Sequence, residues 1–149
     1  MIKMGTQNYS FELNSKLSEL KALNQHLIAF VRNIGLSQIS MSEINICLDE
    51  LFTNIVLYGF KDDLEHKIKF TMKVNDNILI VSIEDDGMPF NPLEKKAIEI
   101  PADVMSAEIG GLGVHITREL MDKICYERKR GKNKLTMNKI IQANGASLA

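Results

Sequence analysis

The chain has 149 residues, a length that fits one domain and leaves no room for two of full size. It carries 18 basic and 19 acidic residues, and this near-neutral balance argues against a general nucleic-acid binder, whose surface needs an excess of positive charge. Hydrophobic residues make up 45% and charged residues 25%, which excludes global disorder, and no apolar run approaches the length of a membrane span.

A short strand and a long helix are predicted near the start of the chain. Residues 9–13 alternate between apolar and polar side chains, which is typical of a half-buried strand. Leucine, valine and isoleucine then recur at steps of three and four residues, which predicts an amphipathic helix over about residues 15–34. Gly35 supplies a plausible left-handed stop for this helix.

A second helix is predicted to begin at a capping box formed by Ser40 and Glu43 and to end at Gly59. One side of this helix is apolar and faces the core. The other side carries Glu50 and Asn54, whose spacing places them one helical turn apart and pointing the same way.

An antiparallel hairpin follows, with strands over residues 68–72 and 78–83 joined by a turn at residues 75–77. The second strand is continuously apolar, which predicts a central place in its sheet, and it runs straight into an Asp-Asp-Gly turn. Residues 91–109 show no sustained period. A loop of this length in a compact domain is typically functional, for example as a lid.

The last third of the chain is predicted to contain a glycine turn at residues 110–113 that feeds a helix. Strands over residues 124–128 and 135–141, joined by a turn at residues 131–133, complete the fold. The order β-α-α-β-β-loop-α-β-β predicts an α/β (α+β) two-layer sandwich, with a mixed β-sheet and helices on one face. We expect a single domain over residues 1–149, with its core at about 9–141.

Three features carry candidate chemistry, and each has an ordinary structural explanation when it is taken singly. A glutamate and an asparagine one turn apart are typical of a solvated helix face. An Asp-Asp-Gly sequence after a strand is typical of a turn. Several glycines before a helix also serve as a flexible connection, so a lone glycine motif is weak support for a binding site.

Taken together, the three features fit a nucleotide. Glycines before a helix expose backbone N–H groups where the helix dipole adds positive potential, and such a site suits phosphates. Asn54 offers a neutral oxygen to Mg²⁺, and Glu50 offers a carboxylate that accepts a proton from a hydroxyl near the terminal phosphoryl group. Asp85, at a strand end, can accept a hydrogen bond from an exocyclic amine such as that of adenine.

These residues resemble the N, G1 and G2 boxes of the GHKL (Bergerat-fold) ATPases, which also include the sensor histidine kinases. The match is closer to the small anti-sigma factor serine kinases, through LDELFTN at 48–54, DDGMPFNP at 85–92 and GGLGV at 110–114. The resemblance covers about residues 9–141 with the boxes in order. It implies a Bergerat ATP-binding fold with ATP and Mg²⁺ as cofactors.

The resemblance also implies a role for each matched residue. Asn54 would coordinate Mg²⁺, and Glu50 would be the general base that activates a serine hydroxyl on a partner protein. Asp85 would bind the adenine amino group, and Gly87 would let the backbone approach the base. Residues 91–109 would form the ATP lid. The phosphates would meet backbone amides of Gly110, Gly111, Leu112 and Gly113.

As partners, the resemblance implies a STAS-domain anti-anti-sigma protein, phosphorylated on serine, and an RNA polymerase sigma factor. It implies a cytoplasmic homodimer that regulates transcription by partner switching, without direct contact to nucleic acid or membrane. The alternative is a non-catalytic switch, in which ATP closes the lid and changes the affinity for a regulatory partner. The presence of Glu50 favours the kinase, because binding alone needs no base there.

The sequence departs from the family pattern before the last strand, where many relatives carry a Gly-Thr pair whose threonine reaches the adenine region. Here the corresponding stretch is residues 131–136, in which Thr136 is a candidate substitute whose register is left open. His115 and Arg118 lie inside the glycine-opened helix and are candidates for phosphate contact. The alternative for both is an ordinary solvated position on a helix.

Overall fold

The structure is a computed structural model that describes residues 6–89, 91 and 110–141. Its elements, in chain order, are β1 (Thr6–Asn14), the 3₁₀ turn η1 (Leu17–Glu19), α1 (Leu20–Ile34), α2 (Gln38–Tyr58), β2 (Lys67–Asn75), β3 (Ile78–Asp85), α3 (Gly110–Leu120), β4 (Lys123–Lys129) and β5 (Lys132–Ile140).

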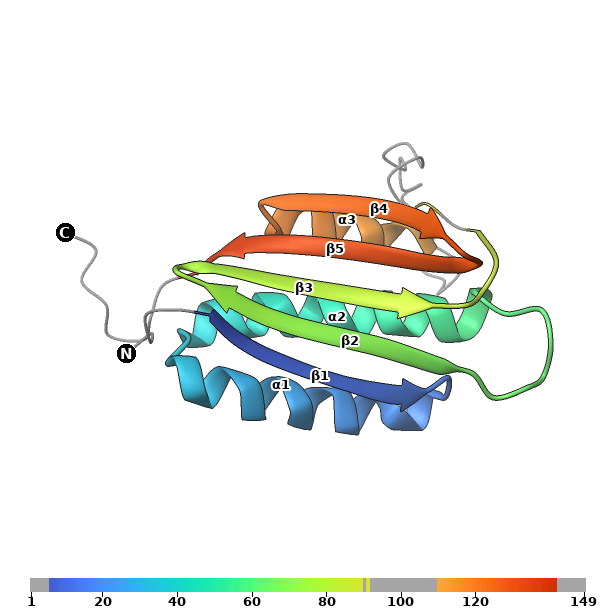
Figure 1. Cartoon of the computed structure of the whole chain (residues 1–149), viewed down its shortest axis with the longest axis horizontal. Helices are drawn as coiled ribbons and strands as arrows, with labels where there is room; N and C mark the ends of the chain where they lie inside the picture. Colours follow the sequence, from blue (N-terminus) through green and yellow to red (C-terminus); the bar gives the residue numbers. More distant parts are fainter. Residues whose placement is uncertain (1–5, 90, 92–109, 142–149) are drawn as a thin grey trace, which may run out of the picture.

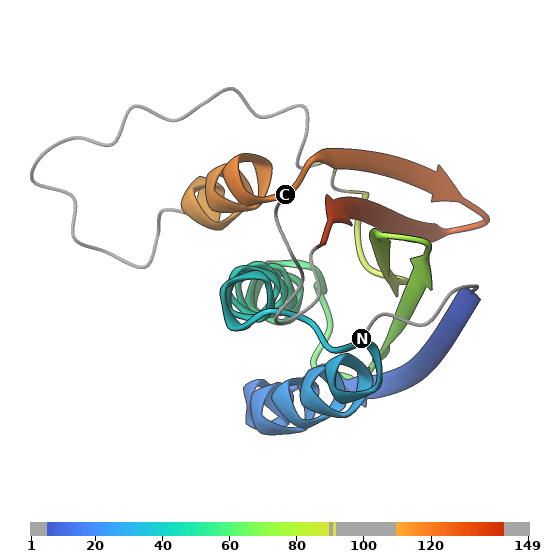
Figure 2. The ribbon, with the colours of Figure 1, turned by 90° about the vertical axis from the view of Figure 1, so that its left-hand side faces the viewer.

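The elements form two layers, with a five-stranded sheet on one side and the three α-helices on the other (Figures 1 and 2). The strand order is β1-β2-β3-β5-β4, so the prediction that β3 is central is confirmed. The two-layer α+β sandwich with helices on one face is confirmed as well. The sheet is not mixed, however, because all of its described ladders are antiparallel.

The antiparallel pairing follows from the place of β5. A helical crossover from β3 to β4 would by itself make these two strands parallel neighbours. The β4–β5 hairpin instead folds back so that β5 lies between them and pairs with both. The hairpin turns at Arg130 and Gly131, whose positive φ angles of 54° and 76° are those of a two-residue turn that matches strand twist.

The core lies between the layers, because alternate side chains of each central strand face the helices. In β2 and β3 every second residue is buried, in keeping with the period of a strand that has one covered face. α1 contributes an apolar stripe and ends at Gly35, whose φ of 66° confirms the predicted left-handed stop. The largest fully buried side chains include Leu23, Leu27, Ile44, Phe52, Phe70 and Met72.

The start of α2 differs from the capping box predicted at Ser40. The helix begins at Gln38, and Ser37 is its N-cap, with a side chain that accepts a hydrogen bond of 3.2 Å from the backbone N–H of Ser40. Glu43 does not reach back to the helix start but pairs with Lys139 of β5 at 3.5 Å. The serine three residues earlier takes the cap because its extended backbone lets its hydroxyl meet a free helical N–H.

Replacing Ser37 by alanine is therefore expected to lower the free energy of unfolding by about 1 kcal/mol, because one helical N–H loses its acceptor. The matched change Ser40→Ala removes no cap and is expected to cost less than about 0.5 kcal/mol. Urea denaturation of the two variants measures the difference. Equal losses of unfolding free energy in the two variants would contradict the assignment of Ser37 as the stabilising cap.

Other boundaries also shift. β5 begins at Lys132, three residues before the predicted start, because the turn is only two residues long. The predicted lid lies outside the described residues except for Asn91. Among the helices that the structure describes, none has the length and apolar character needed to cross a bilayer.

Candidate active site

Three segments that are distant in the sequence lie together at one end of the helical layer: the second half of α2, the chain after β3, and the start of α3. The position of the start of α3 follows from how α3 packs along α2. Lys139 donates to the carbonyl of Leu120, the last residue of α3, at 2.7 Å and pairs with Glu43 near the start of α2. One turn further along α2, the thiol of Cys47 hydrogen-bonds Thr117.

These contacts show that α3 runs antiparallel to α2. Glu43 lies near Leu120, to which Lys139 connects it, and Cys47 contacts Thr117. Moving toward the C-terminus of α2 therefore corresponds to moving toward the N-terminus of α3. Since both helices rise about 1.5 Å per residue, the same register brings the glycine-rich start of α3 toward the half of α2 that holds Glu50 and Asn54. Figure 2 shows the two helices side by side.

The segment after β3 docks on the end of α2 through two glycines. The backbone N–H of Met88 donates to the carbonyl of Gly59, the C-cap of α2, at 2.8 Å. A Cβ on Gly87 would lie closer than 3.0 Å to that same carbonyl oxygen and to the carboxylate of Asp85. Gly87 is therefore needed for close backbone approach to the helix end.

We expect Gly87→Ala to push this segment away from α2 and to destabilise the fold by about 1–3 kcal/mol, because backbone atoms cannot yield as side chains do. The matched change Gly131→Ala meets open space and costs about 1 kcal/mol through its positive φ alone. Amide hydrogen exchange at Met88 separates the two. Protection should fall in the first variant and persist in the second, and unchanged protection in both would contradict the packing argument.

The carboxyl group of Asp85 is buried, with 7% of the residue exposed. Its Oδ1 accepts hydrogen bonds from the backbone N–H of Gly87 at 2.8 Å and from Nδ2 of Asn133 at 3.0 Å. Burial is the largest influence on this group and raises its pKa, and the nearby Asp86 acts in the same direction. The two hydrogen bonds and the charge of Arg128 partly offset the effect of burial.

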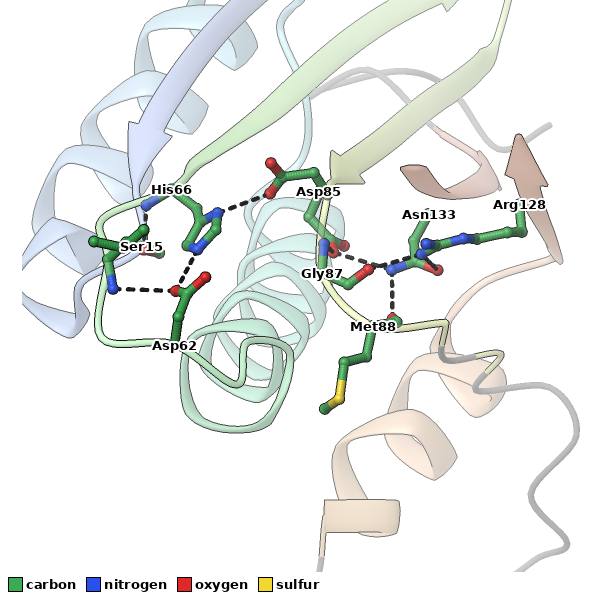
Figure 3. A network of polar contacts seen from close by, with 10 residues as sticks. Ser15, Asp62, His66, Asp85, Gly87, Met88, Arg128 and Asn133 are labelled. Carbon is green, nitrogen blue, oxygen red and sulfur yellow. Dashed lines mark hydrogen bonds and ion pairs between the residues drawn. The ribbon is translucent and has the colours of Figure 1, made fainter. Parts of the chain in front are cut away.

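A polar network fixes the same segment from the β4–β5 hairpin (Figure 3). Asn133 donates a second hydrogen bond to the carbonyl of Met88 at 2.8 Å, and its own Oδ1 accepts from Nη1 of Arg128 at 3.1 Å and from the hydroxyl of Tyr126. Arg128 also donates to the carbonyl of Gly87 at 2.7 Å. The β4–β5 hairpin thus holds both the Asp85 side chain and the backbone of the segment that follows β3.

A second brace comes from His66, on the other side of this segment (Figure 3). The ring lies between two carboxylates, with Nε2 2.7 Å from Asp62 and Nδ1 3.0 Å from Asp86. It stacks on Phe60 at 4.0 Å between ring centroids. The hydrogen bond with Asp62 is the main cause that raises the pKa of His66, and Asp86 adds to it. The loop after α2 is thereby tied to the residue next to Asp85.

Glu50 and Asn54 lie on α2 as predicted, one turn apart. Glu50 is exposed and makes no hydrogen bond or ion pair with the residues that the structure describes, so its carboxylate is accessible. Asn54 is half-buried and has a polar contact. Within the described residues no group of three or more His, Cys, Asp or Glu side chains could hold a metal. Asn54 could offer Mg²⁺ one amide oxygen, and the remaining ligands would then have to be phosphate and water oxygens.

The glycines at residues 110–113 do not form a turn before the helix, as predicted, but make its first turn, since α3 begins at Gly110. This places their backbone N–H groups among those that a helix start leaves without internal partners. Positive potential from the helix dipole gathers at the same place. Phosphate binding by this stretch stays a prediction, now placed at the first turn of α3.

The remaining sequence candidates are Thr136, His115 and Arg118, and the structure does not place Thr136 beside Asp85. Thr136 pairs with Ser82 in the middle of the sheet, three residues along β5 from Asn133. It is Asn133 that stands opposite Asp85 and hydrogen-bonds it, and the sequence prediction missed this residue. His115 is exposed and lies 4.0 Å from Glu119, one turn away, while Arg118 is exposed with a partner of its own.

The family of the chain follows from comparison with known proteins. The family model described as the histidine kinase-like ATPase domain matches residues 13–139. The chain therefore belongs to the histidine kinase-like ATPase domain family, and the resemblance seen in the sequence boxes is confirmed.

Two relatives show which branch the chain is similar to. The serine/threonine-protein kinase BtrW of Bordetella bronchiseptica is 27% identical over 94 residues, which span 63% of this chain and 66% of that kinase, just under two thirds. The anti-sigma F factor of Bacillus subtilis is 22% identical over 116 residues, which span 73% of this chain and 80% of that protein.

Two solved structures share the fold. The RsbU and RsbW domains of Rv1364c from Mycobacterium tuberculosis superpose with a TM-score of 0.64 at 13% identity, over 92% of this chain and 34% of that one. The histidine kinase domain of a blue-light activated histidine kinase from Erythrobacter litoralis gives a TM-score of 0.55 at 17% identity, over 84% of this chain and 60% of that one. At these identities the likeness concerns the fold.

Proposed function

We propose that this chain binds ATP and transfers its γ-phosphoryl group to a serine of a partner protein, as an anti-sigma-type protein serine kinase. The observation that carries the proposal is the meeting of three segments: the α2 half with Glu50 and Asn54, the docked segment after β3, and the start of α3. Membership of the ATPase family and similarity to a serine/threonine-protein kinase and an anti-sigma factor support it.

The buried carboxylate of Asp85 binds the base in this proposal. Oδ1 already accepts two hydrogen bonds, while Oδ2 accepts none from the described residues, so Oδ2 is the atom available to the adenine amino group. Gly87, which has no side chain, lets the backbone after β3 pack against the carbonyl of Gly59, and in this proposal the same backbone approaches the base. The backbone N–H groups of residues 110–113 bind the phosphates at the start of α3.

Glu50 serves as general base. Its exposed carboxylate accepts the proton of the serine hydroxyl as the new oxygen–phosphorus bond forms and the bond from the γ-phosphorus to the bridging oxygen breaks, leaving ADP. Asn54, one turn further along, would hold Mg²⁺, which when bound neutralises developing charge on the phosphates. Residues 91–109 would act as a lid over the nucleotide.

We further propose that the phosphorylated partner is a STAS-domain anti-anti-sigma protein and that a sigma factor is the second partner, bound by a cytoplasmic homodimer. Similarity to the anti-sigma F factor and likeness to a structure that contains an RsbW domain support this assignment. The second candidate is a switch without phosphoryl transfer, in which ATP binding alone changes partner affinity.

The test has two stages. Calorimetry with ATP and Mg²⁺ is expected to give saturable binding at one site per chain. Labelled ATP, incubated with the chain and with STAS-domain proteins encoded in the same genome, is expected to label a serine of one of them. Tight binding without transfer to any partner would favour the switch, and absence of binding by the folded chain would overturn both functions.

A further inference from the structure

Asn133 stands where the β4–β5 hairpin meets the segment after β3. It is buried, with 7% of the residue exposed, and the sheet register places it opposite Asp85 on β3 and opposite Arg128 on β4. No other described residue contacts both the carboxylate of Asp85 and the backbone of Met88 through its side chain. Asn133 therefore joins the candidate base-binding carboxylate to the hairpin.

Four of the partners of Asn133 fix the orientation of its amide. Nδ2 faces two groups that can only accept, the carboxylate Oδ1 of Asp85 and the carbonyl of Met88. Oδ1 faces the Arg128 guanidinium, which can only donate, and the hydroxyl of Tyr126. A flipped amide would set donor against donor and acceptor against acceptor, so the network admits one orientation.

We propose that Asn133 is the positioning residue of the base-binding site: its amide holds Oδ1 of Asp85 so that Oδ2 alone is offered to the exocyclic amine of a 6-aminopurine. This inference rests on the proposed function, in which the site binds ATP. A carboxylate oxygen offered in this way accepts from a 6-amino group and repels a 6-oxo group. Asn133 thereby contributes to the choice of adenine over guanine through Asp85.

The charge of Asp85 depends on the same contact. Burial and the neighbouring Asp86 raise the pKa of Asp85, while the hydrogen bond from Asn133, that from Gly87 and the charge of Arg128 on β4 lower it. Replacing the amide by a group that cannot donate leaves the carboxylate with one donor fewer in a buried place. A second carboxylate at this position would oppose ionisation of Asp85 directly, because two like charges would meet at hydrogen-bond distance.

Asn133→Asp is the sharpest test, because the side chain keeps its shape and changes only its charge and donors. At about pH 8 the ATP affinity, measured by calorimetry relative to a control, is expected to fall about 100-fold. Lowering the pH lets the paired carboxyls share a proton, so that the new side chain can again donate to Asp85, and at about pH 5.5 at least about tenfold of the loss is expected to return. The ratio of ATP affinity to GTP affinity should also fall at about pH 8 and partly recover at about pH 5.5.

The matched control is Asn138→Asp, the same change on the same strand, five residues away and opposite Ile80. It is expected to bind ATP as wild type does at both pH values. Asn133→Ser supplies a shorter hydroxyl that does not titrate, so we expect about a tenfold loss that lowering the pH does not restore. In that variant without nucleotide, ¹³C NMR is expected to show the Asp85 carboxyl titrating at higher pH than in wild type.

The outcomes separate the inference from the function on which it rests. Wild type and the Asn138→Asp control that bind ATP, beside an Asn133→Asp variant with a pH-dependent loss, support the inference. A loss in Asn133→Asp that is equal at both pH values, or affinity within about threefold of the control at both, overturns the positioning role and leaves the proposed function standing. A folded wild type that binds no ATP overturns both.

Discussion

Glu50→Gln is expected to reduce phosphoryl transfer about 100-fold or more while ATP affinity stays within about threefold of wild type. Glutamine keeps the size and the polar atoms of the side chain but cannot accept the serine proton at neutral pH. Because Glu50 is exposed and makes no hydrogen bond with the described residues, its loss should not disturb α2. Transfer is followed with labelled ATP and a phosphorylatable partner, and binding by calorimetry.

The matched control for this change is Glu12→Gln on β1, which neutralises an exposed carboxylate on a strand of the sheet that the candidate site does not use. It should transfer at the wild-type rate. A Glu50→Gln variant that also transfers at that rate would exclude Glu50 as the base. A parallel fall in ATP affinity would assign it to binding.

Asp85→Asn is expected to weaken ATP binding by about 100-fold, because an amide N–H would face the adenine amino group, and two donors would meet in a buried site. The fold should survive, since an asparagine oxygen can accept both existing hydrogen bonds, from Gly87 and from Asn133. Calorimetry with ATP measures the loss. The same change at Asp76, in the β2–β3 turn, should leave affinity unchanged.

Stability without nucleotide should move the other way in Asp85→Asn. The pKa of Asp85 is raised above its ordinary value of 3.8, so the folded chain binds this proton more tightly than the unfolded chain. The ionised group therefore destabilises the fold at neutral pH, and this cost diminishes as the pH falls through the raised pKa toward 3.8. We expect the variant to gain about 1 kcal/mol at neutral pH.

The gain should shrink as the pH falls into the acid range, where the carboxyl of wild type becomes protonated and loses its charge. Urea denaturation of both chains at several pH values measures the difference. A variant that is less stable than wild type at neutral pH would show that the carboxylate stabilises the segment after β3. The proposed opposition between stability and binding at this position would then be wrong.

Periodicity was sufficient to predict most of the fold. The strand-period and helix-period patterns placed β1, α1, β2 and β3 within a few residues, because each buries one face against the other layer. Gly35 fixed the end of α1, since a left-handed residue there favours glycine. Pairing direction was less predictable, because the place of β5 between β3 and β4 depends on contacts that are remote in sequence.

The boundary errors share one cause, which is that short polar side chains serve several local roles. Both Ser37 and Ser40 can cap a helix, and backbone geometry selected Ser37. Asn133 was assigned to a turn because Gly131 precedes it, yet the turn is two residues long, with Arg130 in the left-handed region. The sequence does not indicate a turn at Arg130 and Gly131, because arginine rarely takes the left-handed conformation that this turn requires.

The candidate site was predictable where spacing determines direction and unpredictable where the tertiary fold does. Glu50 and Asn54 share a helix face by spacing alone. The partners of Asp85 come from β4 and β5, more than 40 residues later in the chain, and only the sheet order brings them together. A sequence search for polar residues near the end of β3 would not find them.

The hydrogen bond between Met88 and Gly59 connects two parts of the proposed nucleotide site, the segment after β3 and the end of α2. Asp85, which would bind adenine, lies three residues before Met88, and α2 carries Glu50, the proposed general base; this backbone hydrogen bond joins the two segments directly, in addition to the contacts of His66. A tilt of α2 would therefore act first on Met88, three residues after Asp85. A partner protein that binds to α2 and shifts it would then change the affinity of the proposed site for the purine.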